Sequence, residues 1–191
     1  GWKIHSKVPL SGLGHGAAGF ALAFTRLYAA TKNAEYLPVI NDILKYENSL
    51  FVERDQNWRD CRDVITNQHK DEIICATSWA HGAPGIGIAR LEMVKAGIPI
   101  DEIEKDLKTA LETTIANGFT GHHTLTNGDL GNLELLINYN QHFNDDEVRK
   151  KIIRVGSIVQ EQIRINGIDL GNKDVFSIGL MSGATGVGYQ F

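Results

Sequence analysis

Two kinds of segment alternate along the chain, and they differ in how their apolar residues are spaced. In the first kind, apolar residues occupy nearly every side of a helix, which is typical of a helix buried on several sides. These segments cover residues 20–28, 86–94 and 130–139. In the second kind, apolar residues recur every three to four positions and leave one polar face, which predicts a surface helix. These cover residues 36–46 and 101–117 and a segment that begins near 144–147.

This alternation predicts the fold class. A buried helix followed by an amphipathic helix, repeated, indicates inner helices that line a core and outer helices that cover them. We therefore expect an all-α protein, an α/α toroid, without convincing strand pairs, since residues 64–67 are too short a run to argue for a sheet. Asp101 with Glu104 resembles a capping box, and Gly118 is a suitable stop after Asn117.

A short glycine motif, [His/Asn/Ser]-Gly-x-x-Gly, precedes each apolar segment. Its four copies begin at His15, His81, Asn127 and Ser182, and we number them first to fourth. Their first glycines are Gly16, Gly82, Gly128 and Gly183, so the intervals of 66, 46 and 55 residues are too irregular for identical solenoid repeats. Because helix N-termini carry free N–H groups and partial positive charge, we expect the motifs to gather at one rim that holds a site.

Composition excludes several classes of function. A net charge of −4 leaves no electrostatic footprint for nucleic acid or an anionic membrane. The apolar runs are far shorter than the roughly 20 residues that a membrane span needs, and the first residues lack the apolar core of a signal peptide. Two cysteines, Cys61 and Cys75, favour a reducing compartment, so we expect a cytoplasmic protein.

The chain has the features of one domain over residues 1–191 that forms the C-terminal portion of a larger toroid. It opens without Met and stops at Phe191, five residues into the helix expected after the fourth motif. A partial toroid exposes inner helices, so we expect the rest of the toroid or another copy to cover them.

The four motifs, in order, resemble those of the lanthionine synthetase C-like family, most closely the C-terminal cyclase domain of class II lanthipeptide synthetases. The similarity is carried by Gly12-Leu13-Gly14-His15-Gly16-Ala17-Ala18-Gly19, by Ser78-Trp79-Ala80-His81-Gly82-Ala83-Pro84-Gly85-Ile86, by Leu125-Thr126-Asn127-Gly128-Asp129-Leu130-Gly131-Asn132 and by residues 179–189. Together these segments span almost the whole chain.

The resemblance implies a cyclase that acts on a precursor peptide. In this family a zinc ion, held by two cysteines and a histidine, binds the peptide's cysteine thiolate, which adds to dehydroalanine or dehydrobutyrine and forms a thioether. His15 matches the family histidine assigned to proton transfer. His81 would line the site without binding metal. Trp79 is either a packing residue or, as an aromatic side chain at the rim, a contact for the peptide.

The chain departs from the family at every zinc ligand. The two cysteine positions fall on Ala80 and Thr126, and the histidine position falls on Asn127. A methyl, a hydroxyl and a carboxamide cannot replace two thiolates and an imidazole, so we expect no zinc at the family site and no cofactor. Ring closure without metal remains open because proximity alone lowers the barrier, and so does a non-catalytic scaffold that binds peptides or thiols.

Other chemical groups carry weaker hypotheses. His122 with His123, or Cys61 with Cys75, are candidate ligands for a displaced metal, although adjacent histidines rarely share one ion. Asp129 begins a helix, where the dipole stabilises a carboxylate.

The polar loop of residues 53–77 carries Arg54, Arg59, Arg62 and His69. This loop is most simply a solvated face and alternatively a surface for an acidic peptide. Glycosidase chemistry would need a carboxylate pair that the motifs lack.

Overall fold

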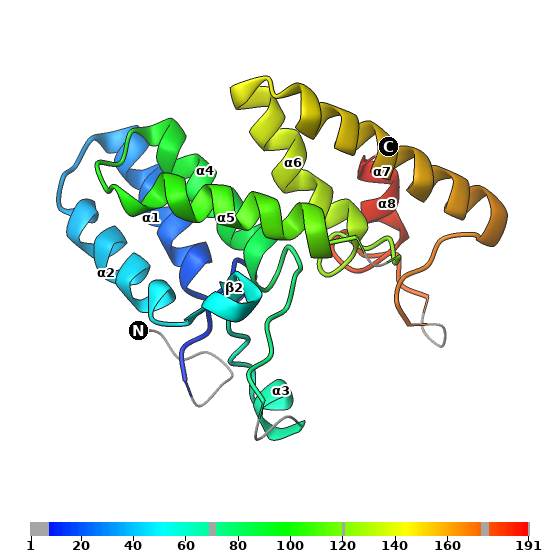
Figure 1. The fold of residues 1–191 in the computed structure, drawn as a ribbon, viewed down its shortest axis with the longest axis horizontal. Coiled ribbons are helices and arrows are strands. Elements are labelled where there is room, and N and C mark those ends of the chain that lie inside the picture. The colour runs from blue at the N-terminus through cyan, green and yellow to red at the C-terminus, as the bar shows by residue number, and fades with distance from the viewer. Residues whose placement is uncertain (1–7, 69–71, 120, 173–175, 191) are drawn as a thin grey trace.

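The computed structural model describes residues 8–68, 72–119, 121–172 and 176–190. Four helices each follow a glycine motif, namely α1 (Ala17–Thr31), α4 (Ala83–Ala96), α6 (Asp129–Phe143) and α8 (Ala184–Gln190). Three further helices, α2 (Tyr36–Asn48), α5 (Glu102–Asn117) and α7 (Asp146–Asn166), come directly after α1, α4 and α6. Figure 1 shows that α2, α5 and α7 lie along the outer side of their partners, as the alternating apolar pattern predicts.

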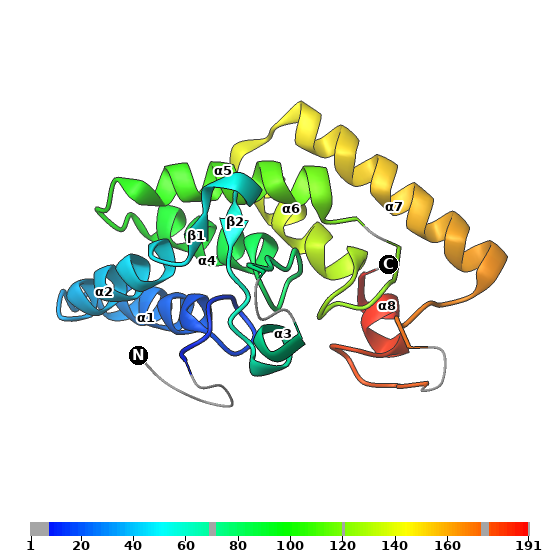
Figure 2. The ribbon, with the colours of Figure 1, turned by 60° about the horizontal axis from the view of Figure 1, so that its bottom comes forward.

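The four motif helices stand next to one another in chain order. Helix α1 packs on α4, and α4 packs on α6. The second view shows α1, α4, α6 and α8 following one another along a curved layer (Figure 2). The helical prediction and the two-layer arrangement are therefore confirmed.

The apolar patterns explain which helices are buried. Helix α4 buries most of its residues, and its side chains join cores shared with α1, α5 and α6. Helix α7 buries only Val148, Val155 and Val159, one stripe of an otherwise polar surface. Its first turn is fixed by Asp145, whose carboxylate accepts from the N–H groups of Glu147 and Val148 at 2.9 and 3.0 Å.

A largely buried ion cluster links the outer layer to the inner layer. Arg90 of α4 donates to Glu47 of α2 at 2.8 Å and to Asp106 of α5 at 3.0 Å. Burial raises the pKa of Glu47, and the neighbouring Arg90 cation opposes that shift. Removing one partner of such a cluster leaves an uncompensated buried charge, which typically costs about 3–5 kcal/mol.

Two expectations about local structure are wrong. No convincing strand pair was expected, yet strands β1 (Phe51–Val52) and β2 (Asn57–Trp58) form an antiparallel hairpin around the 3-10 turn Glu53–Asp55. Helix α3 (Asp63–Gln68) follows, within residues 53–77 that were expected to form a loop. Trp58 explains the hairpin, because it is 1% exposed and packs edge-on against Phe51 in the core between α1 and α4. Asp101 makes no capping bond to α5 and is itself in a helical conformation.

The second glycine of every motif is required by a close contact. A Cβ atom built at Gly19, Gly85, Gly131 or Gly186 would lie 2.5, 2.1, 1.7 or 2.0 Å from the carbonyl oxygen six residues earlier. Only glycine fits where a backbone approaches this closely. The motif therefore folds the chain back against the first turn of its helix, and this contact of the second glycine recurs in all four copies.

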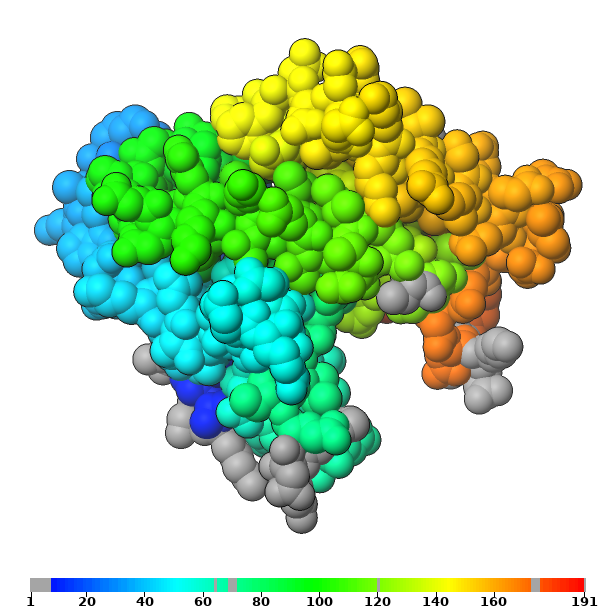
Figure 3. All heavy atoms as spheres, in the orientation of Figure 1, coloured from blue at the N-terminus to red at the C-terminus, as the bar shows by residue number. Residues whose placement is uncertain are grey.

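The motif ends of the inner helices face a hollow in the surface. In the space-filling view the molecule is concave between the segment around residues 60–68 and 72–80 and the segment around residues 165–172 (Figure 3). Among the described residues, no helix is long and apolar enough to cross a membrane.

Candidate active site

A chain of backbone hydrogen bonds joins the four glycine motifs. Gly14 donates to the carbonyl of Ala80 at 3.0 Å, Ala80 donates to Thr126 at 3.0 Å, and Thr126 donates to Met181 at 2.8 Å. Each of these residues lies two positions before the first glycine of its motif. The four motifs thus meet at equivalent positions and form one continuous rim, as the sequence predicts.

This chain of bonds brings together the three positions that match family zinc ligands. Ala80 is buried and offers only a methyl group. The Thr126 hydroxyl donates to the Met181 carbonyl at 2.7 Å, and the Asn127 side-chain oxygen accepts from the Ser78 hydroxyl at 3.3 Å. The side chains present therefore do not fit zinc, since they supply neither thiolate nor imidazole. No group of three His, Cys, Asp or Glu side chains in the described part of the chain is arranged to hold a metal ion.

His15 and His81 occupy the same position in the first and second motifs. The His15 side chain is exposed at the rim, and His81 is 8% exposed. Burial, with smaller contributions from the Arg62 cation and from His15, lowers the pKa of His81 to about 4, against the opposing effect of Asp60. His81 is therefore a neutral imidazole near neutral pH, able to form hydrogen bonds but poorly suited to accept a proton.

The sequence did not reveal that Asp60 and Arg62 form an ion pair next to His81. Asp60 is 5% exposed, and both of its oxygens accept from Arg62, with distances of 3.0, 3.0 and 2.6 Å. The pair reaches the rim because Ser11, beside the first motif, donates its hydroxyl to the Arg59 carbonyl at 2.9 Å. The sequence shows Arg62 only as one arginine of a basic loop, and no spacing pattern connects Asp60 to His81.

Trp79 has a mixed environment. It is partly buried, and it packs against the core of Leu13, Ala18, Trp58 and Ala83. The backbone carbonyl of Trp79 also makes the close contact that requires glycine at position 85. A packing role for Trp79 is thus part of the fold, while contact with a peptide stays a prediction.

The two cysteines do not form a metal site. Cys61 and Cys75 are both free. Burial raises the pKa of the Cys61 thiol, and burial together with Asp55 raises that of Cys75 to about 12. Within the described residues, neither thiol belongs to a group of three His, Cys, Asp or Glu side chains arranged to hold a metal ion.

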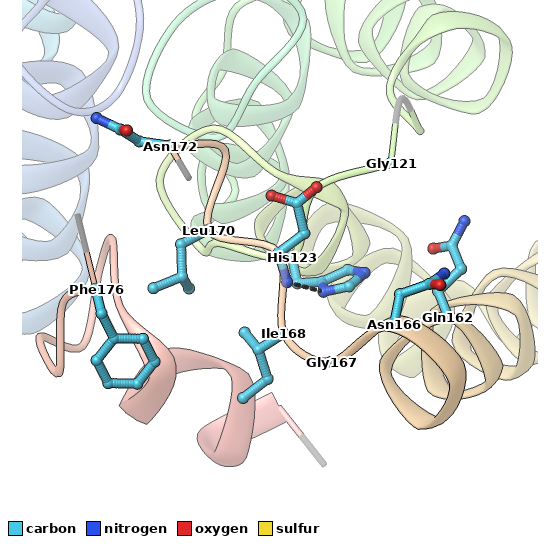
Figure 4. Close-up of a pocket in the computed structure, with 10 residues that line it drawn as sticks. Gly121, His123, Gln162, Asn166, Gly167, Ile168, Leu170, Asn172 and Phe176 are labelled. Carbon is cyan, nitrogen blue, oxygen red and sulfur yellow. Dashed lines mark hydrogen bonds between the residues drawn. The ribbon is translucent and has the colours of Figure 1, made fainter. Parts of the chain in front are cut away.

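The paired histidines have separate partners. His123 is buried, and its Nδ1 accepts from the Asp169 N–H at 3.0 Å, while His122 Nδ1 lies 3.3 Å from the Thr124 hydroxyl. His123 lines a cavity of about 590 Å³ together with Gln162 and Asn166 of α7 (Figure 4). Because a backbone N–H can only donate, Nδ1 of His123 is occupied as an acceptor and is not available to a metal.

The basic loop and Asp129 also have structural partners. Arg54 pairs with Asp55 at 2.9 Å and Arg62 pairs with Asp60, so two of its three arginines are locally neutralised. His69 lies outside the described residues. Asp129 is the first residue of α6 and accepts from the Gly121 N–H at 3.2 Å, in agreement with a structural role at a helix start.

Comparisons with known proteins support one assignment. The family model described as lanthionine synthetase C-like protein matches residues 3–191. The chain is 28% identical over 199 residues to the lacticin 481/lactococcin biosynthesis protein LcnDR2 of Lactococcus lactis subsp. lactis, an alignment that covers 98% of this chain and 21% of that protein. The fold is similar to that of nisin cyclase, with a TM-score of 0.68 and 20% identity over 93% of this chain and 44% of that one. The chain thus spans about a fifth of the curated relative that it matches.

Proposed function

Because the chain belongs to the lanthionine synthetase C-like family, we propose that it forms part of a cyclase domain that closes thioether rings without zinc. Its substrate is a precursor peptide that carries cysteine together with dehydroalanine or dehydrobutyrine. The rim supports this proposal. The backbone bonds from Gly14 to Ala80 and from Ala80 to Thr126 keep the first three motifs together, although the ligand side chains have been replaced.

The chemistry uses the substrate's own thiol. Its sulfur loses a proton and adds to the β-carbon of the dehydro residue, and the π electrons move toward the carbonyl to give an enolate. A proton delivered to the α-carbon completes the thioether, so the reaction is neither oxidative nor reductive. His15 is our candidate for carrying protons because its imidazole is exposed at the rim and an imidazole can both accept and donate a proton.

In this proposal the rate enhancement comes from binding of the precursor peptide at the rim and not from a metal. Holding a thiol and an alkene in reacting geometry removes much of the entropic barrier. The neutral His81 and the half-buried Trp79 line the rim beside His15 and are our candidates for contact with the peptide. A mechanism without zinc lacks the metal that lowers the thiol pKa, so we expect the rate to rise with pH toward the pKa of a free cysteine, near 8.5.

A second function is favoured by the substituted ligand positions. The Thr126 hydroxyl and the Asn127 carboxamide are hydrogen-bonded within the rim, as structural side chains are. A scaffold that binds the peptide without catalysis would need only an intact rim, without side chains that bind a metal. In this case the chain presents peptide to a catalytic site elsewhere.

Partners and compartment complete the proposal. Phe176, Ile178 and Tyr189 are 73, 77 and 69% exposed, and we propose that the rest of a toroid or another copy covers this apolar surface. The free thiols of Cys61 and Cys75 support a reducing compartment, the cytoplasm.

A ring-closure assay tests the proposal. The full-length protein is incubated with a dehydrated precursor peptide and a zinc chelator, and unreacted thiols are counted by alkylation and mass spectrometry. We expect faster ring closure than with peptide alone, and loss of this acceleration in His15→Asn. Binding without acceleration would support the scaffold, and inhibition by the chelator would overturn the metal-free mechanism.

A further inference from the structure

The second glycine motif is closed differently from the other three. In the first, third and fourth motifs, the residue after the first glycine donates its N–H directly to the carbonyl seven residues earlier. These bonds run from Ala17 to Leu10 (2.8 Å), from Asp129 to His122 (2.8 Å) and from Ala184 to Ser177 (2.9 Å). The equivalent residues of the second motif are Ala83 and Ala76.

A side-chain amide from the β1–β2 hairpin lies between these two residues. Ala83 donates its N–H to Asn57 Oδ1 at 2.9 Å, and Asn57 Nδ2 donates to the Ala76 carbonyl at 3.0 Å. The same amide accepts from the Trp58 N–H at 2.8 Å and donates to the Thr77 hydroxyl at 3.1 Å. Asn57 is 2% exposed, and all four of its hydrogen-bonding sites are used.

The inserted amide is accompanied by a different backbone path. Gly82 has a φ of +86°, and a Cβ atom there would lie 1.7 Å from the Ala76 oxygen and 3.1 Å from Asn57 Oδ1. Before it, Ser78 and His81 exchange backbone bonds of 2.9 and 3.2 Å. The resulting closed turn presents Trp79, Ala80 and His81 to the rim.

The amide is held rigidly from its own side as well. Trp58, the next residue, is buried in the core between α1 and α4. The preceding carbonyl, that of Gln56, accepts from the Thr113 hydroxyl of α5 at 2.7 Å. Because its chain neighbours are fixed in the core and on α5, the Asn57 side chain holds the second motif at a defined distance from the core.

We propose that Asn57 is a positioning residue of the second motif. Its amide sets the separation between Ala76 and Ala83, and by doing so it holds the Ser78–His81 turn against the first motif. Asn57 does not touch the reacting atoms and acts through the turn. The consequence for ring closure rests on the proposed function, whereas the consequence for the turn itself does not.

Hydrogen exchange and kinetics on the full-length protein test this role. Asn57→Ala removes the acceptor for the Ala83 N–H, so its exchange should become about tenfold faster or more, as should that of the Ser78 and His81 amides. Asn57→Asp keeps the acceptor for the Ala83 N–H but replaces the donor to the Ala76 carbonyl with an oxygen. We therefore expect the Ser78 and His81 amides to exchange faster in this variant too, while Ala83 stays more protected than in Asn57→Ala. Thr113→Ala is the matched control, because it releases the same hairpin from α5 without touching the inserted amide.

Ring closure gives the functional readout. We expect kcat/KM to fall about tenfold in Asn57→Ala, with a higher KM as well as a lower kcat, because the misplaced turn carries His81 and Trp79, the candidates for contact with the peptide. Unchanged exchange at Ala83 and in the turn, or equal effects of Asn57→Ala and Thr113→Ala, would overturn the proposal. Altered exchange with unchanged kcat/KM would also overturn it. If the unsubstituted protein closes no rings, the proposed function fails, and exchange in the turn alone then decides the role of Asn57.

Discussion

His15 and His81 begin neighbouring copies of one glycine motif, yet their surroundings differ. The first is exposed at the rim, and the second is buried beside Arg62 and Asp60. The difference comes from the segment of residues 51–77, which contributes the Asp60–Arg62 pair and the amide of Asn57 to the second motif. A repeated backbone unit therefore supplies equivalent positions, and the segments inserted between repeats decide what a side chain there can do.

The largest expected effect tests how tightly the second motif is packed. Gly82→Ala forces a side chain onto a φ of +86° and into the Ala76 carbonyl, so we expect a loss of more than about 3 kcal/mol in the free energy of unfolding. Gly97→Ala is the control, since Gly97 has a φ of +68° with nothing within 4 Å of its Cβ position and should lose only about 1–2 kcal/mol. Urea unfolding measures both, and equal losses would contradict the close contact.

The next effect separates the two histidines in the reaction. His15→Asn should slow ring closure about 100-fold, because a proton carrier is lost. His81→Asn should slow it less, since His81 is neutral and contributes hydrogen bonding. Initial rates from thiol alkylation compare the two variants. The assignment of roles would be reversed if His81→Asn proved the more damaging change.

The burial of His81 should make the free energy of unfolding depend on pH. The pKa of His81 is about 4 in the folded protein against 6.5 ordinarily, so between these values the unfolded chain binds a proton that the folded chain does not. Stability should therefore fall as pH decreases through this window, by about 1–2 kcal/mol between pH 7 and pH 5.

Two variants isolate that effect. His81→Asn should flatten the part of the pH dependence that this residue causes, and the matched change His15→Asn should leave most of it, since His15 is the smallest of the causes that lower the His81 pKa. Urea midpoints at pH 7 and pH 5 provide the comparison. An identical pH slope in the unsubstituted protein and His81→Asn would show that another group is responsible.

The smallest effect concerns the neighbours of His81. Arg62→Gln removes a cation and should raise the pKa of His81 by less than about one unit, because burial is the larger cause and remains. Asp60→Asn should lower the same pKa, although it also frees Arg62 from its partner. Histidine NMR titration measures both shifts, and shifts of the same sign would contradict the geometry.

The sequence was sufficient to predict the helices and their two layers. Apolar spacing identified the buried α4 and the one-sided α5 and α7, and the repeated glycines predicted that the helix starts gather at a rim. These predictions succeed because they depend on local periodicity and on a backbone contact that only glycine permits.

The features it could not predict depend on contacts between distant residues. The hairpin of β1 and β2 has two residues per strand, too few for a period-two pattern, and Trp58 stabilises it through the core. Asn57 and Asp60 are ordinary polar residues in a polar loop until the fold places them at the second motif. The resemblance supplied the roles of His15, Ala80, Thr126 and Asn127, and the fold shows that the last three meet through Ala80 and Thr126.

The central claim is that this rim keeps the family's architecture without its metal. The direct test is zinc content per chain, measured by mass spectrometry on protein purified without added metal. The triple variant Ala80→Cys, Thr126→Cys, Asn127→His is measured beside it, because the Ala80–Thr126 bond of 3.0 Å brings these positions together. We predict essentially no zinc in the unsubstituted protein and about one zinc per chain in the triple variant. Stoichiometric zinc in the unsubstituted protein would contradict the account.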